Sequence, residues 1–253
     1  MGENPVFKPV CVTNRPLLSA VFFARPQAGP RPVIACQYLR RSMAWIACTP
    51  CRNARFAIAR SAMTYPDLLI LRHGETLWNR AGRMQGSADS PLTALGRQQA
   101  AAQGRLLSAF DAGAFQIWTS PQGRAVETAQ IALPGQKRSI RHDSRLAEIA
   151  MGDWTGVERS EIRRQVPHLF EKGENLIWYD HAPGGEGLEA LYMRTGSFLA
   201  DLAQPAILFT HGITSRMLRC HALGLERDRF ADLPGGQGVI YFLRGGEQTC
   251  LAE

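Results

Sequence analysis

The sequence predicts an α/β fold, a three-layer sandwich in which helices flank a mainly parallel sheet. Short apolar runs of strand length alternate with longer stretches in which apolar residues recur at helical spacing. Strands that alternate with helices in this way build a parallel sheet. The chain shows no internal repeat, no glycine-rich dinucleotide motif and no Walker A loop, so nothing indicates the common nucleotide-binding folds.

Each element follows from a local pattern. The apolar run 67–71 predicts a first buried strand, and Thr93 predicts the N-cap of a helix that reaches about Phe110. The further elements expected in chain order are a strand at 115–119, a helix at 123–131, a strand at 139–142, a helix at 187–202, a strand at 206–210, a helix at 214–223 and a terminal hairpin of 239–243 and 248–251. Sites in such folds lie at the carboxyl ends of the strands.

The excess positive charge lies in the first quarter of the chain. Residues 1–62 hold nine of the 29 basic and one of the 22 acidic residues, which leaves 20 basic and 21 acidic residues in 63–253. The net charge of +7 therefore does not describe a basic folded face, and no nucleic-acid-binding module is recognisable. The apolar run 17–24 is too short to span a bilayer. We expect neither nucleic acid nor a membrane as a partner.

Residues 1–62 are predicted to form a basic, poorly ordered extension, and 63–253 to form the domain. The segment is rich in Pro and Arg and lacks helical or strand periodicity. A native tail, an organelle presequence and translation from a start upstream of Met63 all remain open. Cys48 and Cys51 form an isolated CxxC without a second pair, which predicts no metal site. The cysteine pattern favours a reducing compartment, so the expected location is cytoplasmic.

Two histidines directly follow predicted strands. His73 comes after the first strand and Arg72, and His211 comes after the strand at 206–210. Each is followed by a glycine, which permits a sharp turn and the close approach of a ligand. Arg124 also lies near the end of a strand. Guanidinium groups match phosphate oxygens, so these cationic and imidazole groups at one edge of a sheet predict a phosphate site.

The motifs resemble those of the histidine phosphatase superfamily, also called the phosphoglycerate mutase-like family, over about 66–253. Six blocks carry the resemblance: Leu71-Arg72-His73-Gly74-Glu75-Thr76 with Asn79, then 82–86 (GRMQG) with 89–96 (DSPLTALG), 120–129 (SPQGRAVETA), 146–148 (LAE) with 152–156 (GDWTG), 183–186 (PGGE) and 210–212 (THG). Arg-His-Gly alone is a weak signal, whereas six blocks in the family's order argue strongly against a chance match. The resemblance implies a phosphoglycerate mutase-like fold.

The resemblance also implies a role for each matching residue. His73 resembles the nucleophile that accepts a phosphoryl group, and Glu148 resembles the acid that protonates the leaving oxygen. Arg72 and His211 complete the implied catalytic set. The implied phosphate-binding residues are Asn79, Gln85, Gly86, Arg124 and Gly212. Neither a metal nor a cofactor is implied, because protein cations supply the charge that Mg²⁺ supplies in other phosphoryl transfers.

Three functions are compatible with these residues. The preferred hypothesis is a phosphomonoester hydrolase that acts on a small phosphorylated metabolite, either with broad specificity or like an α-ribazole phosphatase. The alternatives are a cofactor-dependent phosphoglycerate mutase and a catalytically silent binding module on the same fold. The tryptophan–glycine block after Glu148 and the short body, with no long C-terminal tail to exclude water, favour the hydrolase.

The segment at about 149–190 is expected to form a cap over the pocket. Its net charge of −4 argues against a doubly phosphorylated substrate if those charges face inward. Trp154, Trp178 and Tyr179 are candidates for contact with the leaving group. Position 187 is Gly where the family often has Ser, which predicts a weaker start for the following helix. An exposed edge strand makes a homodimer possible.

Overall fold

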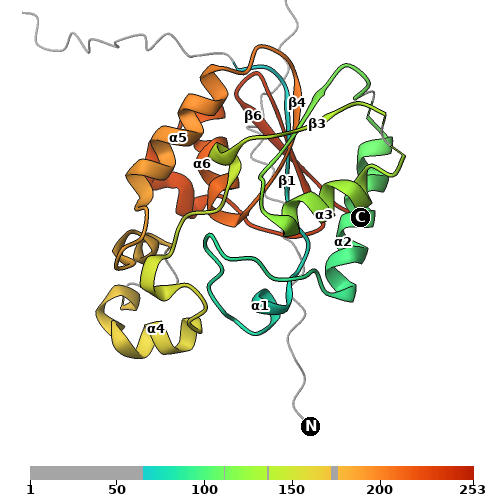
Figure 1. Cartoon of the computed structure of the whole chain (residues 1–253). Helices are drawn as coiled ribbons and strands as arrows, with labels where there is room; N and C mark the ends of the chain where they lie inside the picture. The colour runs from blue at the N-terminus through green and yellow to red at the C-terminus, as the bar shows by residue number, and fades with distance from the viewer. Residues whose placement is uncertain (1–64, 111, 136, 172–175) are drawn as a thin grey trace, which may run out of the picture. The chain divides into compact units, whose positions relative to one another are not determined.

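The computed structural model describes residues 65–253, except 111, 136 and 172–175 (Figure 1). The predicted extension and its CxxC therefore lie outside the described residues. The strands are β1 (Leu68–Arg72), β2 (Gln116–Thr119), β3 (Ile140–His142), β4 (Ala206–Thr210), β5 (Ile240–Arg244) and β6 (Glu247–Leu251). They form one sheet in the order β3-β2-β4-β1-β5-β6. The pairs β3–β2, β2–β4 and β4–β1 are parallel, whereas β5 pairs antiparallel with both β1 and β6.

Helices cover both faces of this sheet, so the predicted α/β sandwich is confirmed (Figure 1). The helices are α1 (Leu77–Arg80), α2 (Ala94–Ser108), α3 (Gly123–Ala132), α4 (Arg159–Gln165), α5 (Leu188–Ala200) and α6 (Gly212–Ala222). The two central strands alternate their side chains between two cores. Leu68 and Ile70 pack with residues of α5 and α6, whereas Leu69 and Leu71 pack with residues of α2 and α3. Burial on both faces explains why β1 reads as a continuous apolar run.

Two helices begin differently from the expectation. α6 starts at Gly212, two residues earlier than expected, and His211 is its N-cap residue. The strand-end histidine therefore stands directly at a helix N-terminus. Gly187 gives α5 no side-chain cap, as expected, but Asp180 Oδ1 accepts a hydrogen bond from Leu188 N at 2.7 Å. A carboxylate from a distant turn thus replaces the missing serine.

The segment 149–190 forms a compact unit beside the sheet, coloured yellow to light orange in Figure 1. It contains α4 and short 3₁₀ turns, and its buried side chains share a core with α5 and α6. Its backbone also pairs with the loop after α1, where Met84 N donates to Val157 O at 2.9 Å and Gly156 N donates to Met84 O at 2.7 Å. The cap is therefore anchored on both sides of the site described below.

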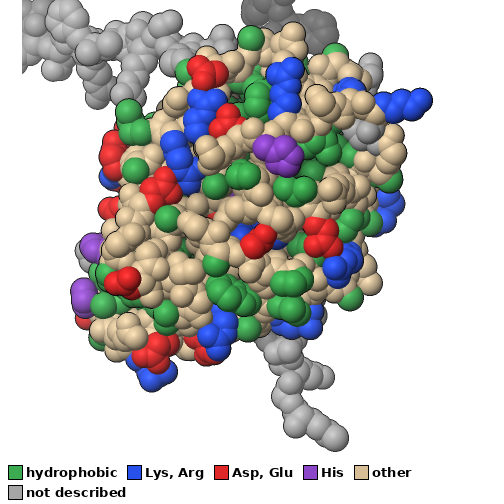
Figure 2. All heavy atoms as spheres, viewed as in Figure 1, with side chains coloured by type: hydrophobic (Ala, Val, Ile, Leu, Met, Phe, Trp, Pro, Cys, Tyr) green, Lys and Arg blue, Asp and Glu red, His purple; other side chains and the backbone are tan. Residues whose placement is uncertain are grey.

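The surface carries charges of both signs. Figure 2 shows Lys and Arg side chains interspersed with Asp and Glu over the visible face. This mixture agrees with the near balance of charge in 63–253. Within the described part of the chain, no helix has the length and apolar character needed to cross a membrane.

Candidate active site

A pocket of about 210 Å³ lies beyond the carboxyl end of β1. It is lined by Arg72, His73, Asn79, Gly82, Arg83, Met84, Gln85, Gly86, Arg124, Glu148, Met151, Arg159 and Tyr179. Seven of the nine residues expected at the site are in this lining. The other two, His211 and Gly212, lie immediately behind it: the ring centroids of His73 and His211 are 5.1 Å apart, and a Cβ on Gly212 would lie 3.4 Å from Arg72 Cζ.

His73 is held as a neutral imidazole with one nitrogen free. Its Nδ1 lies 2.7 Å from the carbonyl oxygen of Gly74. A carbonyl can only accept, so Nδ1 carries the proton and Nε2 keeps its lone pair. Burial first, and then the charges of Arg72 and Arg124, hold the pKa of His73 well below its usual value, although the Gly74 carbonyl opposes this. The side chain is therefore ready to act as a nucleophile near neutral pH.

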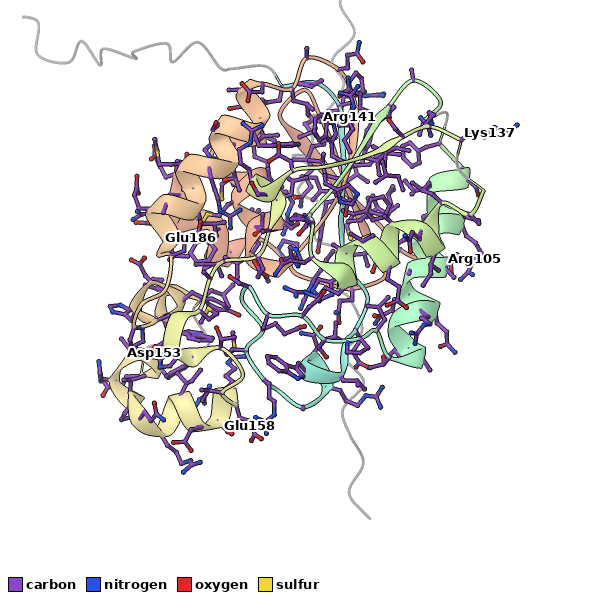
Figure 3. All side chains as sticks on the ribbon, in the orientation of Figure 1. Arg105, Lys137, Arg141, Asp153, Glu158 and Glu186 are labelled. Carbon is purple, nitrogen blue, oxygen red and sulfur yellow. The ribbon has the colours of Figure 1, made fainter. Side chains whose placement is uncertain are left out.

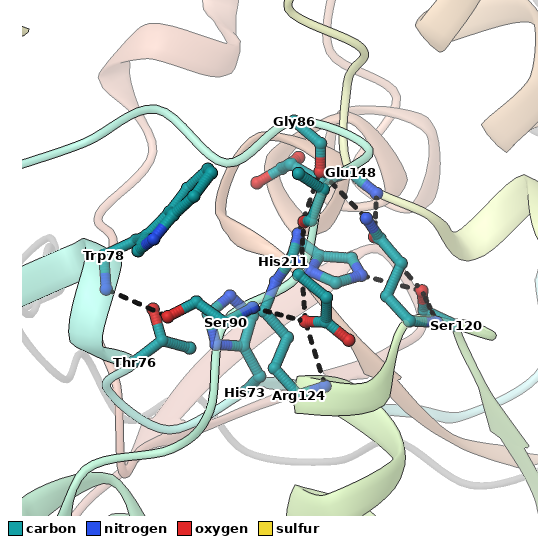
Figure 4. Close-up of polar contacts among 12 residues, drawn as sticks. His73, Thr76, Trp78, Gly86, Ser90, Ser120, Arg124, Glu148 and His211 are labelled. Carbon is teal, nitrogen blue, oxygen red and sulfur yellow. Dashed lines mark hydrogen bonds and ion pairs between the residues drawn. The ribbon is translucent and has the colours of Figure 1, made fainter. Parts of the chain in front are cut away.

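His211 is completely buried beside His73 (Figure 4). Its Nε2 lies 2.8 Å from Ser120 Oγ, and its Nδ1 has no partner among the described residues. Burial, followed by the charge of Arg124, holds its pKa well below the usual value. When Ser120 donates to Nε2, the proton sits on Nδ1, which is then a neutral donor.

The half-buried Arg72 and the buried Arg124 place two guanidinium groups near His73. Arg124 is anchored by Ala88 O at 2.6 Å, Gly86 O at 3.1 Å and Asp89 Oδ1 at 3.1 Å (Figure 4). The Nε atoms of both arginines are buried and have no hydrogen-bond partner within the described residues. Leaving a buried donor of a cation without a hydrogen-bond partner costs free energy. An anion bound in the pocket would therefore stabilise both arginines.

Glu148 lies at the N-terminus of α6. Its Oε2 accepts from Gly212 N at 2.9 Å and Ile213 N at 3.2 Å, and its Oε1 accepts from Thr214 N at 3.1 Å and Thr214 Oγ1 at 3.0 Å. The first turn of a helix offers unpaired N–H groups and a positive dipole end, which suit a carboxylate. Glu148 thus occupies an anion-binding site that the first turn of α6 forms next to Arg72.

Gly86 and Gln85 both line the pocket, as expected, and Gly86 makes a further contact that the sequence did not indicate. The carbonyl of Gly86 accepts from Arg124 and from Gln122 Nε2 at 2.8 Å, so it anchors the arginine. Gln85 is buried, and its Oε1 has no hydrogen-bond partner within the described range. Gln122 Oε1 also accepts from Glu148 N at 2.9 Å. Gln122 therefore joins the arginine anchor to the Glu148 backbone, a long-range contact that no local pattern predicts.

Position 74, directly after His73, requires glycine for a different reason from the one expected. The φ of Gly74 is not in the left-handed region, so no unusual turn requires it. A Cβ at this position would instead lie 2.1 Å from the carbonyl oxygen of Gly96, in the first turn of α2. Gly74 therefore allows α2 to approach the strand end.

The described residues of the cap contribute few groups to the pocket, and none of these groups is acidic. Met151, Arg159 and Tyr179 line the pocket. Trp154 and Trp178 are buried in the cap core instead, so the expectation that they contact a leaving group is not met. Figure 3 labels Asp153 and Glu158 on the cap and Glu186 near α5.

The acidic residues of the cap have other partners or lie outside the pocket lining. Glu158 pairs with Arg83 at 2.9 Å, and Glu186 pairs with Arg194. None of the described acidic residues of the cap lines the pocket. These charges do not face into the pocket, so the cap's net charge of −4 gives no argument against a doubly phosphorylated substrate.

Burial raises the pKa of Tyr179 to about 12, and the charge of Glu148 adds to this shift. The hydroxyl therefore remains protonated in the physiological range and can act as a donor in the pocket. Among the described residues there is no group of three or more His, Cys, Asp or Glu side chains arranged to hold a metal ion.

Comparison with known proteins agrees with this geometry. The chain is 37% identical over 171 residues to the probable phosphoglycerate mutase GpmB of Salmonella paratyphi C (strain RKS4594), covering 63% of this chain and 75% of that protein. The fold is similar to that of the mycobacterial glucosyl-3-phosphoglycerate phosphatase solved with VO3, with a TM-score of 0.63, 30% identity and coverage of 74% and 97% of the two chains.

A second solved structure, the α-ribazole phosphatase of Shigella flexneri, gives a TM-score of 0.60 at 25% identity, over 74% of this chain and 94% of that one. Residues 68–252 match the family model of the histidine phosphatase superfamily, branch 1. With the strand-end histidines, the paired arginines and this match over most of its length, the chain belongs to the histidine phosphatase superfamily.

Proposed function

We propose that the protein is a metal-independent phosphomonoester hydrolase that works through a phosphohistidine on His73. The observation that carries this proposal is the state of His73: its Nδ1 is fixed on the Gly74 carbonyl, and its unprotonated Nε2 is in the field of the charges of Arg72 and Arg124. A neutral imidazole next to two cations with unpaired donors suits attack on a bound phosphate ester.

In the first step, His73 Nε2 attacks phosphorus and the bond to the leaving oxygen breaks. Arg72 and Arg124 stabilise the negative charge on the nonbridging oxygens, and His211 Nδ1 supplies a neutral donor. Glu148, in its protonated form and away from the N–H groups of α6, gives its proton to the leaving oxygen, which departs as an alcohol.

In the second step, water attacks the phosphohistidine and the P–N bond breaks. Glu148, now a carboxylate, takes the proton of that water, so inorganic phosphate is released and both residues return to their initial states. To reach either oxygen, Glu148 has to leave the first turn of α6. The freed N–H of Gly212 is then available to a phosphoryl oxygen, which fits its expected role.

The pocket supports a small substrate with a single phosphoryl group next to His73. Its volume of about 210 Å³ suits a phosphoryl group with a small leaving group. Both the mycobacterial glucosyl-3-phosphoglycerate phosphatase and the Shigella α-ribazole phosphatase, with similar folds, are named as phosphatases.

A phosphoglycerate mutase is the second candidate. The similarity to GpmB favours it, and no acidic residue of the described cap lines the pocket to repel a second anionic group. Both reactions share the phosphohistidine, and they differ in whether water or a second substrate hydroxyl accepts the phosphoryl group.

A panel of phosphomonoesters, assayed for phosphate release beside 3-phosphoglycerate isomerisation, separates the two. The hydrolase proposal expects phosphate release from at least one panel member to exceed isomerisation. Rapid isomerisation with slow hydrolysis of every ester would overturn it in favour of the mutase.

A further inference from the structure

A loop that follows α6 is held by hydrogen bonds close to the catalytic residues. This positioning loop, residues 233–238, connects the turn at Arg227–Asp232 to β5. Three successive carbonyls accept hydrogen bonds from side chains of α6 and β5: Leu233 O from Arg216 Nε at 3.0 Å, Pro234 O from Arg219 Nη2 at 2.7 Å, and Gly235 O from Tyr241 Oη at 2.7 Å. Arg219 also stacks over the Tyr241 ring at 3.8 Å. Arg216 and Arg219 thus hold the loop on the same helix whose first turn holds Glu148.

The positioning loop brings Gln237 to the catalytic residues. Gln237 Nε2 donates to Asn79 Oδ1 at 3.2 Å and to the carbonyl of His73 at 3.3 Å. A primary amide nitrogen has two hydrogens, and both are used here. Gln237 therefore contacts the backbone of the nucleophile and a pocket side chain at once, although it is not itself part of the pocket lining.

These contacts determine which way the Asn79 amide faces. Asn79 Oδ1 accepts from Thr76 N at 3.2 Å as well as from Gln237, so both of its lone pairs are engaged. The oxygen and nitrogen of an amide point to opposite sides. With its oxygen fixed towards Thr76 and Gln237, the side chain presents Nδ2 as its remaining polar group in the pocket that Asn79 lines.

We propose that Gln237 is a positioning residue that acts through Asn79, holding the Asn79 amide so that its Nδ2 donates to the transferring phosphoryl group. The proposal rests on the phosphoryl-binding function proposed above. A reversed amide would present an oxygen to the anion and repel it. It would also set the Asn79 amino group against the N–H of Thr76 and the amino group of Gln237, leaving donors unpaired.

Three variants test this role. Gln237→Ala removes this donor and leaves Thr76 N as the one remaining partner of Asn79 Oδ1 among the described residues. We therefore expect orthophosphate to bind about 3- to 10-fold more weakly, which corresponds to one hydrogen bond. Gln237→Glu offers only acceptors, which favours the reversed amide, so we expect a loss of ~30-fold or more. Gln237→Asn keeps the amide donor on a shorter side chain, so it serves as the variant with the smallest expected loss of phosphate affinity.

The measurement is the Kd of inorganic phosphate by calorimetry, with kcat and KM on a phosphomonoester beside it. Binding is measured in the full chain and in the double variant Asn79→Ala/Gln237→Ala. Since Gln237 acts through Asn79, the double variant should bind phosphate no more weakly than Asn79→Ala alone. Gln204→Ala, which removes an exposed glutamine paired with Gln116, is the matched control and should leave the Kd unchanged.

Two results would overturn the proposal: an unchanged Kd in Gln237→Glu, or fully additive losses in the double variant. Thermal unfolding of each variant separates weakened binding from unfolding. If the wild-type protein binds orthophosphate but hydrolyses no ester, the proposed hydrolase function fails while the Kd comparison still decides the role of Gln237.

Discussion

The two walls of the pocket are built in different ways. The sheet wall, formed by the strand-end residues around His73, is buried and cross-linked by hydrogen bonds to the backbone. Of the described residues of the cap wall (149–190), Met151, Arg159 and Tyr179 line the pocket, and the described acidic side chains lie outside the lining. On the proposed function, the sheet edge carries the phosphoryl chemistry, which needs fixed donors, and the cap contacts the leaving group.

The largest expected effect comes from the sheet wall. His73→Ala removes the nucleophile and should lower kcat by at least ~10⁴-fold, since the neighbouring imidazole of His211 lies behind the pocket lining. Steady-state hydrolysis of the best panel substrate measures it. His142→Ala, which removes an exposed histidine on the edge strand β3, should leave kcat unchanged. Normal hydrolysis by the His73 variant would exclude this residue as the nucleophile.

Glu148→Gln should lower kcat by ~10²- to 10³-fold for alkyl phosphates, because an alkoxide needs a proton to leave. A nitrophenyl phosphate has a stable leaving group, so its first step should lose much less. The measurement is the ratio of the two substrates in single-turnover phosphoenzyme formation. Equal losses for both would show that Glu148 acts through the N-terminus of α6 and not as the acid.

The cap should show a smaller and more selective effect. Tyr179→Phe removes one donor from the pocket and should raise KM by about 3- to 10-fold for substrates with a hydroxylated leaving group, with kcat changed little. A panel that varies the leaving group at constant phosphate measures the selectivity. A uniform fall in kcat across the panel would place Tyr179 with the sheet wall, contrary to the contrast drawn above.

The buried histidines also predict how stability depends on pH. The pKa values of His73 and His211 lie below the unfolded value of about 6.5, so the unfolded chain binds more protons in acid. The free energy of unfolding should therefore fall as the pH drops below about 7, by up to ~1.4 kcal/mol per pH unit for each histidine. Urea unfolding at pH 7.5 and 5.5 measures the fall. A His211→Gln variant with an undiminished slope would contradict this origin.

No effect at all is expected from removal of the first 62 residues. A chain that begins at Met63 keeps every residue of the pocket and of both cores, so its kcat and KM should equal those of the full chain. A large loss of activity in the shorter chain would show that residues 1–62 belong to the domain.

The same contrast explains what the sequence could predict. The apolar runs of β1 and β4 and the helical spacing of α2 and α5 are local patterns, so these elements follow from the sequence alone. Strand-end placement then brings together Arg72, His73 and Arg124, as expected from the rule for parallel sheets.

The missed contacts are long-range and involve residue types with no characteristic pattern. Gln122 and Gln237 act through amides, and only the folded chain shows that one reaches Glu148 and the other reaches Asn79. The sequence predicts a cap at about 149–190, but the direction of its charges depends on short turns and ion pairs that periodicity does not specify. The only sequence sign of Gln237 is its glycine-rich surroundings at 235–238.

The most direct test of the whole account is to trap the phosphoenzyme. Full-length protein is mixed with a phosphomonoester substrate, quenched in base after a few milliseconds and digested for mass spectrometry, since phosphohistidine survives base better than acid. We expect a phosphoryl group on the peptide that contains His73, located on that side chain, and none in His73→Ala. A phosphoryl group on another residue, or rapid turnover with no phosphoenzyme at any time, would contradict it.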